Sequence, residues 1–160
     1  MSHFVSNVST RKQAIGVLAA LLMCCSLMQQ EVASAGENEN PMDILVVVNK
    51  NVPVNSVNET VLRGIFLKVR KDWPGGQAAM PVNAKDDTLR AAFRSKVLQM
   101  DASAEKRHWE EVKVKYGQSE PPSLSNNLKA VFSLKGAVSY VYRKDFAEGI
   151  AKVVMVIPAF

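Results

Sequence analysis

The segment at the start of the chain most constrains what the rest can fold into. Arg11 and Lys12 precede an apolar stretch from Ala14 to Met28, and a short polar stretch then leads to Ala-Ser-Ala at 33–35. A charged start, an apolar centre and an Ala-x-Ala end are typical of a secretory signal peptide. The apolar stretch is shorter than the ~20 residues that span a bilayer comfortably. The sequence therefore predicts a signal peptide at residues 1–35, cleaved near Ala35, and a periplasmic or secreted product.

Both cysteines of the chain, Cys24 and Cys25, lie within this segment. An alternative is lipidation of one of them, because Leu-Leu-Met-Cys at 21–24 resembles a lipobox, although Met23 is bulky where a lipobox has a small residue. We expect membrane contact only if the signal is retained or lipidated. After cleavage near Ala35 no thiol remains, so the rest of the chain must fold on its core alone, without disulfides.

Composition and charge set further limits. The 160 residues are 48% hydrophobic and 22% charged, which is ordinary for a globular protein, and this length suits a single domain. The net charge of +5 is partly concentrated at Lys68, Arg70, Lys71 and Lys85 and within 106–115. We interpret these clusters as solvated faces. Nucleic acid is not an expected partner, because the aromatic residues of a base-stacking platform are missing.

Strand and helix patterns alternate after a flexible leader at 36–41. We expect strands at 44–48, 79–82, 137–141 and 152–157, and helices that begin near Ser56, at Asp86 or Asp87, at Asp101 or Ser103, and at Leu124. Residues 44–48 are apolar at every position, a pattern typical of a strand covered on both faces in a largely parallel sheet. The sequence therefore predicts one α/β domain at 42–158, with a mixed, mostly parallel sheet flanked by helices.

Local signals predict how three of the helices begin and pack. Ser56 is the expected N-cap of the first helix, with Glu59 completing a capping box. His108 lies with Ala104 and Val112 on the inner stripe of the third helix. In the helix at 124–134, we expect Leu128, Val131 and Phe132 to face the core, and Gly136 to take the left-handed conformation after it.

The order of several short motifs is recognisable along residues 43–142. They are Ile44 to Lys50, the helix "LRGIFL" at 62–67, "WPGG" at 73–76, "MPV" at 80–82, "LRAAF" at 89–93, Trp109, Pro121-Pro122, and "KGAVSYV" at 135–141. The chain resembles a short, single-lobe member of the periplasmic phosphate-binding proteins, the substrate-binding proteins of ABC transporters. That resemblance implies one lobe of the type II periplasmic binding-protein fold.

Full-length members of that family hold phosphate between two lobes, through backbone N–H groups at helix starts, hydroxyl groups, an Arg and an Asp. Their Arg-x-Asp-Gly-Ser-Gly-Thr type of sequence corresponds here to Val-Asn-Ala-Lys-Asp-Asp-Thr at 82–88. Only Thr88 agrees, since Val82 replaces the Arg and Ala84 the Asp. The carboxylates of Asp86 and Asp87 would repel an oxyanion at this helix start. A ligand would therefore need a different arrangement or a partner.

Four residues are candidates for ligand binding, because a single lobe leaves uncovered the face that a second lobe would meet. They are Asn49, Ser56, Thr88 and Ser139. Exposed backbone donors near them could hold a small oxyanion or the loop of a partner.

Three aromatic residues are candidates for a partner surface, since aromatic side chains often anchor interfaces. They are Trp73, Tyr116 and Tyr140, with simple core packing as the alternative for Trp73.

The inventory of catalytic groups is thin. After cleavage His108 is the only histidine, which leaves no metal site, no cofactor and no cysteine nucleophile to expect. Asp86 and Asp87 could act as an acid/base pair, but helix capping explains them. We therefore expect a non-catalytic exported binding module that acts through an envelope or membrane protein. A solute-binding protein for a small, phosphate-like anion is the alternative, and an enzyme is a third possibility.

Overall fold

The computed structural model describes residues 39–159, which belong to one compact unit that begins at Asn38. The predicted signal peptide, its cleavage point, the two cysteines and the first residues of the leader lie outside the described residues. Among the described residues, the buried side chains of the core lie between Ile44 and Ile157.

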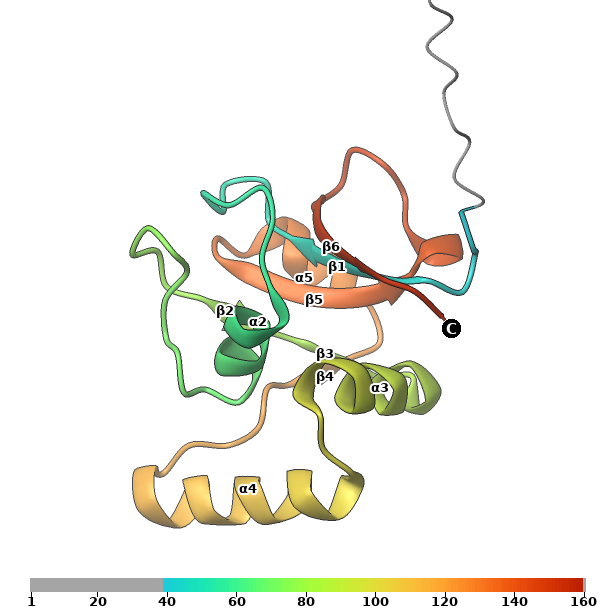
Figure 1. The fold of residues 1–160 in the computed structure, drawn as a ribbon. Coiled ribbons are helices and arrows are strands. Elements are labelled where there is room, and N and C mark those ends of the chain that lie inside the picture. The colour runs from blue at the N-terminus through green and yellow to red at the C-terminus, as the bar shows by residue number, and fades with distance from the viewer. Residues whose placement is uncertain (1–38, 160) are drawn as a thin grey trace, which may run out of the picture. The chain divides into compact units, whose positions relative to one another are not determined.

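Strands and helices alternate along this part of the chain (Figure 1). Their order is β1 (Ile44–Val48), α2 (Glu59–Phe66), β2 (Met80–Pro81), β3 (Asn83–Ala84), α3 (Asp87–Phe93), a π-helical turn (Arg94–Leu98), α4 (Ala102–Tyr116), β4 (Ser123–Leu124), α5 (Asn127–Ser133), β5 (Ala137–Tyr142), a 3₁₀ turn (Arg143–Asp145) and β6 (Lys152–Ile157). The predicted α/β class is confirmed.

The main sheet has the strand order β2-β5-β1-β6. β1 is antiparallel to both β5 and β6, and only the short pair of β2 and β5 is parallel. The prediction of a mostly parallel sheet is therefore wrong. All five residues of β1 are buried, as their apolar side chains predicted. A run of apolar residues indicates that both faces of a strand are covered, but it does not indicate the direction of the neighbouring strands.

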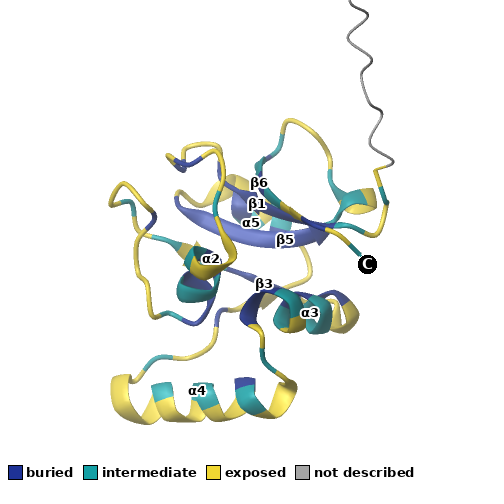
Figure 2. Ribbon diagram, viewed as in Figure 1, coloured by how far each residue is buried: buried dark blue, intermediate teal, exposed yellow. Residues whose placement is uncertain are grey.

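The two faces of β1 belong to two different apolar clusters. Ile44, Val46 and Val48 face a large cluster with side chains of α2 and α3, while Leu45 and Val47 face a smaller one with α5. This alternation follows from the two-residue period of a strand. Figure 2 shows β1 and β5 buried between these layers.

Three aromatic rings form the centre of the large cluster. The rings of Phe93 and Tyr140 stack with centroids 3.8 Å apart, and Phe66 packs against both at a tilt. The Tyr140 hydroxyl lies 3.3 Å from Oδ1 of Asn83 in β3, which pairs in parallel with β4. The stack thereby joins α2, α3 and β5 to the small second sheet.

Helix starts were predicted with mixed success. Asp86 and Asp101 cap α3 and α4, as expected, because each carboxylate accepts a bond from the backbone N–H three residues on. Ser56 does not cap α2. Asn58 does, accepting from Val61 N at 2.9 Å, so the predicted capping box is wrong and the helix begins later.

The end of α5 also differs from the expectation. The helix spans only Asn127–Ser133, and its inner face carries Val131 and Leu128, while Phe132 is 63% exposed. Gly136 takes the predicted left-handed conformation, with φ of +83°. A Cβ there would overlap the backbone carbonyl of Ala78, so this position needs glycine for space as well as for conformation.

Helix α4 is attached to the body in an unusual way. Its expected inner residues Ala104, His108 and Val112 are only partly buried, and its one buried residue is Glu105. A ring nitrogen of His108 lies 3.2 Å from the Leu67 carbonyl, so the histidine is a packing residue. Figures 1 and 2 show α4 as a largely exposed helix beside the rest of the fold. Both the ion pairs of Glu105 and the packing of Trp109 against the large cluster connect it to the body.

Candidate functional site

A pocket of about 270 Å³ lies where α3 and α5 begin, beside the end of β5. Its walls come from the residues that cap both helices and from the end of β5. They comprise Ala84, Lys85, Asp86, Leu89, Leu124, Ser125, Asn126, Asn127, Leu128, Val141, Tyr142 and Asp145. This is the candidate site, because two helix starts, which are favourable places for anions, meet there.

The charge inside this pocket opposes an anion. Asp86 and Asp145 contribute carboxylates against the single ammonium of Lys85. Burial raises the pKa of the Tyr142 hydroxyl, and the charges of Asp86 and Asp145 raise it further. The same two negative charges would repel an oxyanion in the pocket.

Side chains of the chain itself bind backbone N–H groups at both helix starts. Oδ1 of Asp86 accepts from Leu89 N at 2.7 Å, and Oδ1 of Asn126 accepts from Lys129 N at 3.0 Å. Asn127 turns inward, where its amide donates to the Tyr140 carbonyl at 2.8 Å. The N–H groups of Leu89, Leu128 and Lys129 and the Asn127 amide therefore have internal partners.

Two of the predicted ligand residues are buried structural residues. The Asn49 amide, at the end of β1, donates to the carbonyls of Val131 and Phe132 at 2.8 and 2.9 Å. The Ser139 hydroxyl donates to the Val82 carbonyl at 2.8 Å and accepts from Asn127, also in the interior. Their polar atoms join strands to helices and do not face a ligand.

The other two predicted ligand residues are exposed and lie on different elements. Ser56 is in the connection before α2, and Thr88 is in the first turn of α3. Neither lines the pocket, although Thr88 is close in sequence to Asp86, which does. The structure does not bring the four residues together into one site.

The predicted partner surface is also divided. Trp73 is only 2% exposed, and its Nε1 donates to the Gly136 carbonyl at 3.0 Å, so the core-packing alternative is the correct one. Tyr140 is fully buried in the aromatic stack. Neither ring can contact a partner. Tyr116, at the end of α4, is 70% exposed and remains available.

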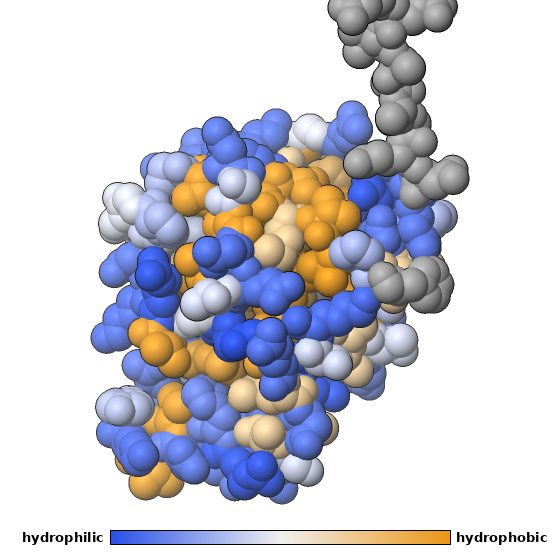
Figure 3. Space-filling view, viewed as in Figure 1, coloured by the Kyte–Doolittle hydropathy of each residue, from blue (hydrophilic) through white to orange (hydrophobic). Residues whose placement is uncertain are grey.

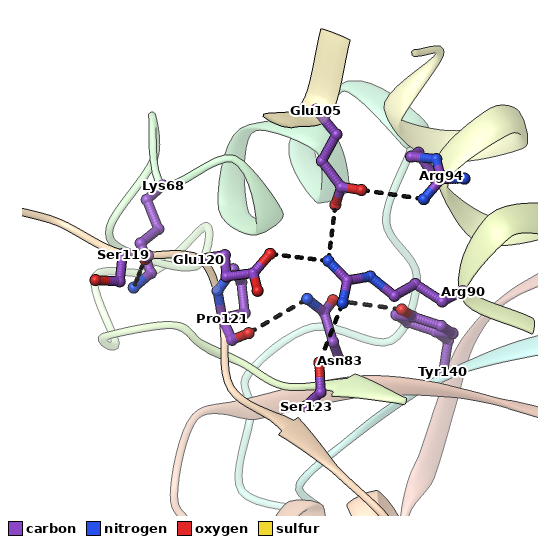
Figure 4. A network of polar contacts seen from close by, with 10 residues as sticks. All are labelled: Lys68, Asn83, Arg90, Arg94, Glu105, Ser119, Glu120, Pro121, Ser123 and Tyr140. Carbon is purple, nitrogen blue, oxygen red and sulfur yellow. Dashed lines mark hydrogen bonds and ion pairs between the residues drawn. The ribbon is translucent and has the colours of Figure 1, made fainter. Parts of the chain in front are cut away.

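A polar network that the sequence analysis did not anticipate joins α4 to α3 (Figure 4). Glu105 accepts from Arg90 at 3.3 Å and from Arg94 at 3.1 Å, and Arg90 also pairs with Glu120 at 2.8 Å. Burial lowers the pKa of Arg90, but the charges and hydrogen bonds of Glu105 and Glu120 outweigh this, so its pKa is raised.

The same network lies beside a second pocket, of about 400 Å³, between α4 and the body. It is lined by Arg90, Ala102, Glu105, Lys106, Trp109, Glu110, Lys113, Ser119 and Glu120. Positive and negative groups alternate on its walls, so it has no preference for one sign of ligand. The only signal for the network in the sequence is the spacing of Arg90 and Arg94, which places both on one helix face.

Metal-binding and membrane-spanning features are absent from the described part of the chain. Within residues 39–159, no group of three His, Cys, Asp or Glu side chains is arranged to hold a metal ion. No helix in this range is long and apolar enough to cross a bilayer.

Comparison with known proteins gives a fold and no closer assignment. No family model matches the chain, and no curated protein matches its sequence. An ABC-type phosphate transport receptor from Vibrio cholerae is similar in structure, with a TM-score of 0.52 and 14% identity, over 72% of this chain and 47% of that one. For a protein from Clostridium perfringens, assigned as a phosphate ABC transporter substrate-binding protein and solved with bound phosphate, the TM-score is 0.51 and the identity 20%, over 71% and 45% of the chains.

The predicted resemblance to one lobe of this fold is therefore confirmed at the level of structure. The chain spans less than half the length of these two proteins and shares the fold of a part of each. Both are described as binding proteins and not as enzymes.

Proposed function

We propose that the chain is a non-catalytic exported binding module that acts through a protein partner in the cell envelope. The observation that carries this proposal is the state of the pocket at α3 and α5. Its helix starts are capped by Asp86 and Asn126, and the carboxylates of Asp86 and Asp145 oppose an oxyanion. A receptor for phosphate would need an excess of positive charge at this place, whereas two carboxylates face one ammonium here.

A protein segment fits this pocket better than an anion. Backbone N–H groups or a basic side chain of a partner can pair with the two carboxylates, and Leu124, which is 39% exposed at the pocket, offers apolar contact area. The chain has the fold of less than half of each solved neighbour.

Site-specific photo-crosslinking in envelope membranes tests the proposal. A crosslinking amino acid at Leu124 should give one dominant adduct with a protein. The matched control is Phe132, which is also apolar and is more exposed, at 63%, but does not line the pocket. Equal adducts at both positions, or none at Leu124, would contradict a partner site at the pocket.

Export is tested separately, on the full chain expressed in a bacterium. N-terminal sequencing of the product should begin at Gly36 if cleavage follows Ala35. A product that retains residues 1–35, or that begins at Cys24 or Cys25 with an attached lipid, would replace the predicted cleavage.

The alternative, a solute-binding protein for a small phosphate-like anion, is supported by one feature. Two helix starts and the Lys85 ammonium lie at the same pocket, as an anion site requires. Calorimetric titration with phosphate, sulfate and small carboxylates separates the two proposals. We expect a flat response to all of them, and saturable binding of any one would favour the solute-binding function.

A further inference from the structure

Two basic segments far apart in the sequence flank the contacts between the turn after α2 and the region of α4. The first is the turn after α2, Lys-Val-Arg-Lys at 68–71, and the second is the last turn of α4, Lys-Val-Lys-Tyr at 113–116. Nζ of Lys68 donates to the Ser119 carbonyl at 2.6 Å, and His108 contacts the Leu67 carbonyl at 3.2 Å. We call residues 68–71 and 113–116 together the basic tip.

Basic side chains outnumber acidic ones at the basic tip, where the bordering acidic residues are Asp72, Glu110 and Glu111. Its eight residues include five basic and no acidic side chains. Among the ion pairs of residues 39–159, none involves Arg70, Lys71, Lys113 or Lys115. The bond of Lys68 to a carbonyl oxygen leaves its positive charge uncompensated. The tip therefore presents a concentrated positive field to solvent.

The basic tip also carries the most exposed apolar side chains of the described residues. Val114 is 86% exposed, Val69 is 78% and Tyr116 is 70%, and no other large hydrophobic residue in 39–159 exceeds the 63% of Phe132. Figure 3 shows apolar side chains among strongly hydrophilic ones over the C-terminal end of α4. Burial of these three side chains would require a surface outside the chain.

The backbone of the turn supports a role for its side chains. Lys68 has a φ of +56°, in the left-handed region where glycine is favoured. The turn is held in place by bonds from Lys68 N to Ile65 O and from Arg70 N to Gly64 O, at 3.1 and 2.8 Å. Glycine would relieve the backbone at this position but would remove one charge and the link to Ser119.

We propose that the basic tip binds the surface of an anionic lipid membrane. Lysine and arginine side chains attract anionic headgroups, while their aliphatic stems and an interfacial tyrosine lie at the apolar boundary. Val69 and Val114 project from the surface, so a fluid bilayer can receive them without a preformed pocket. A protein interface would need a complementary cavity around each anchor. The proposal goes beyond the partner pocket, which lies at the starts of α3 and α5, and does not depend on it.

Vesicle binding tests this inference with the product isolated from a bacterium that expresses the full chain. The probes are vesicles of phosphatidylcholine alone and vesicles with one third phosphatidylglycerol. We expect binding only to the anionic vesicles, weakened when salt rises from about 0.05 M to about 0.2 M because exposed charges are screened. The double variant Lys71→Gln/Lys115→Gln should lose about fivefold in affinity for each lysine, or about 25-fold together.

A matched variant distinguishes an effect of the basic tip from an effect of the net charge of the chain. Lys129→Gln/Lys135→Gln removes two exposed lysines on and after α5, and should change affinity by less than about twofold if the tip is the binding surface. Val69→Ser/Val114→Ser should weaken binding at both salt concentrations, since it removes apolar contact. Circular dichroism and thermal unfolding check that each variant is folded.

Three results would overturn the proposal. They are equal binding to neutral and anionic vesicles, equal losses in the two lysine pairs, and unchanged binding of Lys71→Gln/Lys115→Gln. If the chain ignores vesicles but binds polyglutamate through Lys71 and Lys115, the tip recognises an acidic protein and not a lipid. Crosslinking at Leu124 is measured independently, so failure of either proposal leaves the other intact.

Discussion

Replacement of Glu105 by Gln should release α4 from the body without unfolding the rest of the domain. Glu105 is the one buried residue of α4, and its carboxylate lies 3.3 Å from Arg90 and 3.1 Å from Arg94. Glutamine keeps the shape but removes the charge, and it can present its single oxygen to only one of the two guanidinium groups.

The expected size of the effect follows from the two contacts that are lost or weakened. A hydrogen bond to a charged group contributes about 1.5–3 kcal/mol, which would give up to about 6 kcal/mol for two. The side chains of Arg90 and Arg94 are 22% and 20% exposed, so water replaces part of the interaction, and Arg90 retains Glu120. We therefore expect α4 to lose about 2 kcal/mol of local stability, or about 30-fold in its opening equilibrium.

Hydrogen–deuterium exchange by mass spectrometry measures this opening directly. Peptides from Ala102–Tyr116 should exchange about 30-fold faster in the variant, while peptides from β1 and β5 should change little. The matched control is Glu110→Gln on the same helix, whose side chain is 64% exposed and 3.9 Å from Lys106. It should cost less than about 0.5 kcal/mol.

Two results would refute the reasoning about Glu105. If α4 exchanges at the normal rate in the variant, then its partly buried apolar residues hold it, and the ion pairs contribute little. If β1 and β5 are destabilised as much as α4, then the helix is not a separately opening unit.

Three further predictions follow from other parts of the structure. Gly136→Ala should destabilise the fold by more than about 2 kcal/mol in urea titrations, because the new Cβ overlaps the Ala78 carbonyl. Gly76→Ala, which also has a positive φ but open space around it, should cost about 1 kcal/mol, and equal costs would show that the overlap at Gly136 relaxes. Burial raises the pKa of Tyr140, so the unfolded chain loses the hydroxyl proton at a lower pH than the folded chain, and the free energy of unfolding should fall as pH rises above about 10. The fall should be smaller in Tyr140→Phe, and parallel stability profiles of the two proteins against pH would contradict this. Asp86→Asn should keep the helix cap and change the free energy of unfolding by less than about 1 kcal/mol. It should lower the pKa of Tyr142 in an NMR titration, and an unchanged pKa would show that the Asp86 carboxylate does not act on Tyr142.

Local sequence signals predicted the elements that depend on neighbours along the chain. The apolar stretch at 44–48 gave β1 with its bounds, and the carboxylates of Asp86 and Asp101 cap the helices that follow them. Each of these features is decided within a few residues, by burial of a strand or by one side chain that bonds a backbone N–H. Ser56 was misassigned because Asn58, two residues later, is an equally good cap.

Features that depend on distant pairing could not be predicted in the same way. Nothing local distinguishes a strand covered on both faces in a parallel sheet from β1, whose neighbours run antiparallel. Trp73 follows an exposed turn and yet packs inside, because its ring reaches the Gly136 carbonyl across the fold.

Among the site residues, the same reason explains why the roles of Asn49 and Ser139 were misjudged. Both are small polar residues at strand positions, and only the arrival of α5 and β3 shows that their polar atoms are used internally. Glu105 was missed because it stands among exposed charged residues of α4. Its burial depends on where α3 and the π-helical turn after it place Arg90 and Arg94.

The place of β1 in the sheet determines the order in which the domain can fold. This first strand lies between β5 and β6, the last two, and Ala159 N even returns to the carboxylate of Asp43 across 116 residues of sequence. Contacts so distant along the chain form slowly, because a long loop must close before any of them stabilises the structure. A chain that emerges from a ribosome or a membrane pore with β1 first therefore cannot complete its sheet until β6 has also emerged. During that interval the five apolar residues of β1 have no sheet partner and stay exposed to other chains. Dilution or a chaperone would therefore favour correct strand pairing over aggregation.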